Sequence, residues 1–163
     1  MPARVVVGVT PDQPPVVLEA ALRFARAFEA ELVLVHVDVS RMITGFDPDG
    51  ALLTTPIDPD ADGGEPVFPV DLEARLADRL AGSGVPWSTV AVAGEPADAL
   101  QHEAERVQAE LIVLGTRERR WQGVREFFAG SLAARLAHRQ SRPVVVVPVA
   151  PAAPGERLPW DVA

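Results

Sequence analysis

The sequence predicts one α/β domain, in which helices cover both faces of a five-stranded, parallel, doubly wound sheet. Three observations predict this fold. Short apolar runs recur along the chain without polar alternation, as in strands that are buried on both faces. Amphipathic stretches with helical spacing separate these runs. The length of 163 residues suits one compact domain with a sizeable core.

The predicted strands are rich in β-branched residues. The first is Arg4 to Val9, which contains four valines and is followed by a proline-rich turn from Thr10 to Pro15. Proline is well suited to the first turn of a helix, so a helix should begin there. The other four predicted strands are Leu32 to Val39, Trp87 to Ala93, Leu111 to Leu114 and Val144 to Val147.

The predicted helices lie between the strands. Apolar residues from Val17 to Phe28 recur at helical spacing, with charged residues between them. Similar stretches predict helices over Asp71 to Leu80, Ala97 to Val107 and Ser131 to Arg139. Right-handed crossovers then place the helices on defined faces of the sheet. In such folds ligands bind beyond the carboxyl ends of the strands, where the strand order reverses.

Two segments fall outside this alternation. Residues 40–70 form an insertion rich in Asp, Pro and Gly, which is too long for a plain connection between a strand and a helix. Residues 150–163 form a tail rich in Pro and Ala. We therefore expect the α/β domain to span residues 1–149, with the insertion inside it and the tail after it.

The composition excludes several classes of function. The chain has 23 acidic and 15 basic side chains, a net charge of −8, which argues against a nucleic-acid partner. It contains no Lys, so a Walker-type phosphate lysine and a Schiff base are excluded. It contains no Cys, which excludes thiol nucleophiles, disulfides and cysteine-ligated zinc. No apolar run is long enough to span a membrane and no targeting signal is visible, so we expect a cytoplasmic protein without a membrane partner.

The strongest candidate for a binding site follows the fourth predicted strand. Gly115, Thr116 and Arg117 come directly after this strand, and Gly130 and Ser131 stand where the last helix is predicted to begin. Backbone N–H groups and the helix dipole at such a start attract a phosphate, and Ser131 would cap the helix. Between Arg117 and Arg142 there are seven arginines and only two glutamates. The alternative is that Gly115 simply ends a strand and Ser131 simply caps a helix.

Four stretches carry a resemblance to a known family. They are the first strand Arg4-Val-Val-Val-Gly-Val, the second strand Leu32-Val-Leu-Val-His-Val, Gly94-Glu-Pro, and the segment from Ala129 to Pro148. In this order and spacing, residues 4–149 resemble the universal stress protein (UspA-like) family. The resemblance implies the strand order 3-2-1-4-5, and a regulatory or stress-protective module that acts through protein partners and an adenine nucleotide.

The phosphate loop of the ATP-binding family members is only partly matched. That loop has a glycine, two residues, a second glycine, nine residues, a third glycine and then serine or threonine. Gly115 and the pair Gly130 and Ser131 match its ends, but Glu118 stands in place of the middle glycine. Fourteen residues separate Gly115 from Gly130, two more than in the family's pattern. The resemblance therefore implies ATP as the cofactor, with binding weakened by the charge and bulk of Glu118.

The cleft that the resemblance implies lies between the first and fourth strands. Family members that bind ATP also carry an aspartate just after the first strand, where this chain has Thr10. No residue is assigned a catalytic role or a metal. The residues implied to line the nucleotide cleft are Gly8, Val9, Thr10, Val37, Gly94, Gly115, Thr116, Arg117, Gly130, Ser131 and Val144.

Other functions and the assembly stay open at this point. The alternatives are a dimeric interaction protein that binds no nucleotide, a slow ATP hydrolase, and a flavin or dinucleotide carrier. The carrier lacks a Gly-x-Gly-x-x-Gly motif after its first strand. The fifth strand is predicted at the sheet edge, where an apolar strand invites pairing, and the resemblance implies a homodimer through Val144, Val145, Val146 and Val147. In the alternative, residues 150–163 cover this edge and the protein is a monomer.

Two further patterns are candidates for metal sites, and neither is favoured. Residues Asp58 to Gly63 copy the first half of a calcium loop, but Pro69 stands where the bidentate glutamate belongs, so a solvated acidic loop is favoured. The histidines His36, His102 and His138 are widely separated and form no His-x-His or His-x-x-x-His pair, so the sequence does not support a zinc site. We expect His36, in or after the second strand, to be hydrogen bonded and structural.

Overall fold

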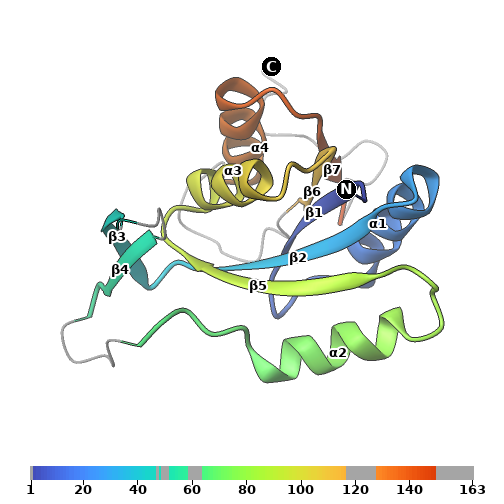
Figure 1. Cartoon of the computed structure of the whole chain (residues 1–163), viewed down its shortest axis with the longest axis horizontal. Helices are drawn as coiled ribbons and strands as arrows, with labels where there is room; N and C mark the ends of the chain where they lie inside the picture. The colour runs from blue at the N-terminus through green and yellow to red at the C-terminus, as the bar shows by residue number, and fades with distance from the viewer. Residues whose placement is uncertain (1, 47, 49–51, 59–63, 117–127, 150–163) are drawn as a thin grey trace, which may run out of the picture.

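The computed structural model describes residues 2–46, 48, 52–58, 64–116 and 128–149. Seven strands and four helices lie in these ranges (Figure 1). The strands are β1 (Arg4–Val9), β2 (Glu31–Asp38), β3 (Arg41–Phe46), β4 (Leu52–Pro56), β5 (Trp87–Ala93), β6 (Leu111–Gly115) and β7 (Val144–Val147). The helices are α1 (Pro15–Phe28), α2 (Val70–Leu80), α3 (Pro96–Arg106) and α4 (Phe128–Arg139).

The main sheet has five parallel strands in the order β5-β2-β1-β6-β7. In sequence order of its own strands this is 3-2-1-4-5, as the family resemblance implies. The central strand β1 pairs with β2 on one side, where Val9 lies opposite His36, and with β6 on the other, where Val7 lies opposite Val113. The predicted fold class is confirmed.

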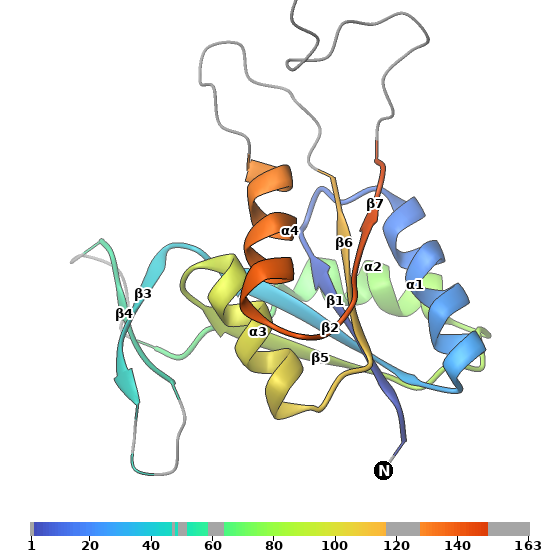
Figure 2. The same ribbon diagram turned by 90° about the horizontal axis from the view of Figure 1, so that it is seen from above.

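Helices cover both faces of this sheet because successive strand residues point in opposite directions. Val5, Val7 and Val9 of β1 pack in the cluster with α1 and α2, whereas Val6 packs in the cluster with α3 and α4. All four of these valines are at most 3% exposed. Figure 1 shows α3 and α4 on one side of the sheet and α2 on the other, and Figure 2 shows α3 and α4 from above.

A second, two-stranded sheet was not predicted. Within residues 40–70, β3 and β4 pair antiparallel, with a register shift between Ile43 and Gly45. This hairpin follows the carboxyl end of β2 and projects away from the main sheet (Figures 1 and 2). The first helical residue of α4 is Phe128, three residues before the predicted start. Gly130 and Ser131 therefore lie inside the helix, and the prediction that Ser131 caps it is wrong.

None of the helices in the described ranges is both long and apolar enough to cross a lipid bilayer.

Candidate functional site

The strand order reverses between β1 and β6, which lie side by side in the sheet. The chain leaves β1 through α1 toward β2, and it leaves β6 through α4 toward β7, on the other side of the sheet. These two helices cover opposite faces. The connections therefore diverge at the carboxyl ends of β1 and β6, which is where open α/β sheets bind ligands. Thr10 and Thr116 follow these two strand ends.

The loop after β1 is held in place by Gln13. The Nε2 group of Gln13 donates to the backbone oxygen of Gly8 at 3.0 Å. The backbone N–H of Gln13 donates to the oxygen of Thr10 at 3.1 Å. These two bonds fold the loop over the end of β1 and leave the Thr10 side chain exposed at the reversal point.

Gly115, at the end of β6, is required by packing. A Cβ atom at this position would lie 2.7 Å from Val17 Cγ2 and 3.1 Å from Val149 Cγ2. It would also lie 3.3 Å from Gln13 Nε2. The next residue, Thr116, donates its N–H to the oxygen of Val147 at 2.9 Å, and its Oγ1 accepts from the N–H of Val149 at 2.8 Å. Gly115 and Thr116 therefore have structural roles that hold without any ligand.

His36, in β2, is hydrogen bonded, as predicted. Its Nδ1 lies 3.3 Å from the backbone oxygen of Val9 and must be the donor, because a carbonyl only accepts. The ring meets Phe68 edge-on, with 5.9 Å between the ring centroids. Val37 lies on the opposite face of the sheet, among residues packed with α3 and α4.

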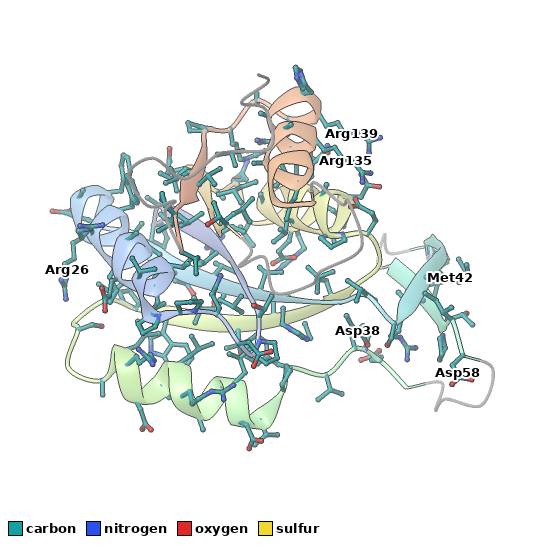
Figure 3. All side chains as sticks on the ribbon, turned by 180° about the vertical axis from the view of Figure 1, so that it is seen from behind. Arg26, Asp38, Met42, Asp58, Arg135 and Arg139 are labelled. Atoms are coloured by element: carbon teal, nitrogen blue, oxygen red, sulfur yellow. The ribbon has the colours of Figure 1, made fainter. Side chains whose placement is uncertain are left out.

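Asp38 ends β2 beside the base of the hairpin, where Figure 3 labels it. Burial alone would raise the pKa of Asp38. Hydrogen bonds from Ser40 and the charges of Arg41 and His36 outweigh burial and hold the pKa below its ordinary value. The Oδ1 atom accepts from Ser40 N–H at 2.9 Å and from Ser40 Oγ at 2.5 Å.

The carboxyl end of β5 is joined to both α3 and α4. Gly94 is buried, has a φ of 112°, which favours glycine, and donates its N–H to the oxygen of Asp38 at 3.1 Å. Glu95 caps α3 and forms an ion pair with Arg135 of α4. Arg139, one turn further along α4, pairs with Asp98. Figure 3 shows Arg135 and Arg139 on the same side of α4.

The structure brings most, but not all, of the predicted cleft residues to the carboxyl edge of the main sheet, where its parallel strands end. Gly8, Val9, Thr10, Gly115 and Thr116 gather at the ends of the adjacent strands β1 and β6, with Val37 and Gly94 at the ends of β2 and β5. Gly130 and Ser131 lie in the first residues of α4, which starts at this edge because it runs back from β6 to β7.

Two of the predicted residues are not placed at this edge. The structure does not bring Val144 there, because this residue begins β7 and pairs with Ile112 near the start of β6. Arg117 lies outside the described residues.

A cavity of about 230 Å³ lies beside this edge, and the sequence did not predict it. It opens between the β1–α1 loop and helix α2, and of the predicted cleft residues only Thr10 lines it. In the described part of the chain no group of three or more His, Cys, Asp or Glu residues is placed to hold a metal ion. Most of the calcium-like segment, residues 59–63, lies outside the described residues.

A family model for universal stress proteins matches residues 1–148. The chain belongs to the universal stress protein family. The match covers all five strands of the main sheet and all four helices. No curated protein sequence matches this universal stress protein significantly.

Solved structures share the fold of this universal stress protein at low sequence identity. A universal stress protein from Archaeoglobus fulgidus has 20% identity and a TM-score of 0.59, with 90% of this chain and 99% of that chain covered. A universal stress protein in complex with cAMP has 22% identity and a TM-score of 0.59, with 91% and 98% covered. A family member from Arabidopsis thaliana with AMP bound has 17% identity and a TM-score of 0.52, with 91% and 93% covered.

Proposed function

We propose that this universal stress protein is a regulatory or protective module that binds an adenine nucleotide beyond the carboxyl ends of β1 and β6. The observation that carries the proposal is the divergence of the chain at these two adjacent strands, with Thr10 after the end of one and Thr116 after the end of the other. Members of the same family with the same fold bind cAMP and AMP.

The direction of α4 supports binding of the phosphate at this edge. Since α4 runs from the end of β6 back toward the start of β7, its N-terminus lies at the carboxyl edge of the sheet. The first N–H groups of a helix are free to donate, and the positive end of the helix dipole attracts an anion. A phosphate group near Gly130 would accept hydrogen bonds from these N–H groups and would also be attracted by the helix dipole.

The sequence of the β6–α4 connection favours a monophosphate over ATP. Glu118 replaces the middle glycine of the family's ATP loop, so its side chain hinders the close backbone approach that the outer phosphates of ATP need, and its charge adds a local repulsion. Arg117, Arg119 and Arg120 surround it in sequence and are cations of the type that pairs with a phosphate group. The proposed ligand is therefore AMP or a close relative, with ATP bound more weakly.

Titration calorimetry with AMP, cAMP and ATP tests the proposal, with GMP as the base control. We expect AMP to bind more tightly than ATP and GMP. The variant Glu118→Gln should strengthen ATP binding by about three- to tenfold, because it removes one charge beside the phosphates. Glu110→Gln removes the same charge from an exposed position at the opposite edge of the sheet and serves as the matched control.

Two results would count against the proposal. If no adenine nucleotide produces heat or raises the unfolding temperature at millimolar concentration, the interaction-protein alternative replaces it. If Glu118→Gln and Glu110→Gln change ATP binding equally, the effect reflects net charge and the phosphates do not lie near Glu118.

A further inference from the structure

The cavity beside the β1–α1 loop has an apolar floor and a rigid rim. Leu18 of α1 and Leu72 and Leu76 of α2 line it, and each is at most 6% exposed. The rim includes Pro11, Pro14 and Pro15, whose rings fix the backbone φ and reduce the freedom of the loop. A ligand that enters this cavity therefore meets a prearranged surface, in which a small area of leucine side chain lies among polar groups of the loop and α2.

Two arginines stand at the mouth of the same cavity. Arg75 and Arg79 are four residues apart on α2, so both side chains lie on one side of the helix. Arg75 donates through Nη2 to the oxygen of Pro11 at 3.0 Å, which positions its guanidinium group and leaves other N–H groups available. The guanidinium group of Arg79 makes no hydrogen bond or ion pair with any residue that the structure describes.

Charge and size together restrict the ligand. Asp12 also lines the cavity, so its three charged side chains sum to one net positive charge, which matches a monoanion. Guanidinium groups pair with carboxylates through two parallel hydrogen bonds. The volume of about 230 Å³ exceeds the space of about 150 Å³ that holds benzene in an engineered cavity, so an apolar body of about six carbons fits.

We propose that this cavity is a second ligand site, which binds a small amphipathic carboxylate. The carboxylate pairs with Arg79 and Arg75 at the mouth, and the apolar body contacts the three leucines. The site is distinct from the proposed nucleotide cleft, because it lies between the loop and α2 on the α1 and α2 face. The proposal does not depend on nucleotide binding.

Backbone NMR of the full chain, titrated with hexanoate, tests the proposal. We expect saturable shifts of amide signals from the β1–α1 loop and from Leu72 to Arg79, with a Kd of about 1 mM for a ligand of this size. Hexan-1-ol has the same carbon chain without the charge and should bind at least fivefold more weakly. Hexylamine, which has the opposite charge, should not shift these signals. A saturating amount of AMP should leave hexanoate binding in place.

The variant Arg79→Gln should weaken hexanoate binding at least fivefold. Arg23→Gln removes the same charge from an exposed position on α1 that does not line the cavity, and it should leave binding unchanged. The proposal is overturned if hexanoate does not shift these signals or if both variants weaken binding equally. If AMP displaces hexanoate, the cavity is part of the nucleotide cleft and the claim of a second site fails. That last result would leave the proposed function intact.

Discussion

Arg135 on α4 and Glu95 at the start of α3 form an ion pair, with 2.9 Å between Arg135 Nη1 and Glu95 Oε1. The other carboxylate oxygen of Glu95 accepts from the N–H groups of Ala97 at 3.0 Å and Asp98 at 3.1 Å. One carboxylate therefore ends the β5–α3 loop, caps α3 and holds α4 against it. Since α4 begins at the proposed nucleotide cleft, this contact helps to orient its N-terminus.

Removing the Glu95 side chain should destabilise the protein more than removing its partner. Glu95→Ala loses both the cap and the ion pair and should lower the free energy of unfolding by about 1–2 kcal/mol. Arg135→Gln loses only a half-exposed ion pair and should cost less than about 1 kcal/mol. Urea denaturation measures both. Glu95→Gln keeps an oxygen that can cap the helix, so a loss as large as that of Glu95→Ala would contradict the capping role.

Gly115→Ala should destabilise the protein even without a ligand. The new Cβ would lie 2.7 Å from the fully buried Val17, whose short branched side chain has little freedom to move. We expect the free energy of unfolding to fall by about 1–3 kcal/mol in urea denaturation. Gly64→Ala is the matched control, because nothing lies within 4 Å of a Cβ at that position. Equal stability of the two variants would show that the end of β6 relaxes freely.

Asp38 should make stability depend on pH in the acidic range. Because its pKa is lowered from the ordinary value of 3.8, its charged form stabilises the folded protein. This contribution is present above pH 3.8 and is lost as the pH falls through the lower folded-state pKa. Asp38→Asn should therefore be less stable than the wild type at pH 7, by a margin that shrinks at pH 3.

Urea denaturation at both pH values measures this margin. Ser40→Ala removes the hydroxyl donor to Asp38 and should show part of the same pH dependence. If Asp38→Asn loses the same free energy of unfolding relative to the wild type at pH 7 and at pH 3, its effect does not come from the charge of Asp38.

The central strands β1 and β6 of the main sheet could be predicted because they are largely buried on both faces, whereas the edge strands β5 and β7 are only partly buried. A run such as Val5, Val6 and Val7 has no polar face, so its pattern is that of a central parallel strand. The hairpin could not be predicted in the same way. Its strands lie in a segment rich in Asp, Pro and Gly, and Met42 and Leu53 are about half exposed. Without a buried face, hydrophobic alternation gives little signal.

The candidate site was predicted in part, through residues that are local in sequence. Gly115 and Thr116 follow a strand and are found from sequence order alone. The cavity combines Thr10 and Pro11 with Arg75 and Arg79, more than 60 residues away, and only packing of α2 against the β1–α1 loop brings them together. The predicted strand from Val144 to Val147 already implied that Val144 begins a parallel strand, away from the carboxyl edge, and the structure places it there. The Gly-Ser pair at residues 130 and 131 suggested that Ser131 caps the helix, but α4 already begins three residues earlier, at Phe128.

The edge strand β7 should join two copies of the chain into a homodimer. β7 ends the main sheet, and β6 is its one partner strand in the described part of the chain. Val146 at its centre is 41% exposed, and an open apolar edge invites a second strand. Pairing with β7 of a second copy about a two-fold axis would give hydrogen-bond partners to the free backbone groups of both edge strands at once. Pro143 and Pro148 lack N–H donors, so the ladder would be confined to the four valines between them.

Val146→Arg should separate this dimer, because it places two arginines, one from each copy, close to the two-fold axis, and like charges across a strand pair are destabilising. Sedimentation equilibrium at about 100 µM should show a wild-type dimer and a variant whose dissociation constant rises at least a hundredfold, about 2.7 kcal/mol of association free energy. Val39→Arg, at a 62% exposed position near the hairpin, is the matched control and should remain dimeric. A dimer that survives Val146→Arg unchanged must use another surface. A wild type that is monomeric at this concentration would show that β7 does not pair between copies, as expected if residues 150–163 cover the strand.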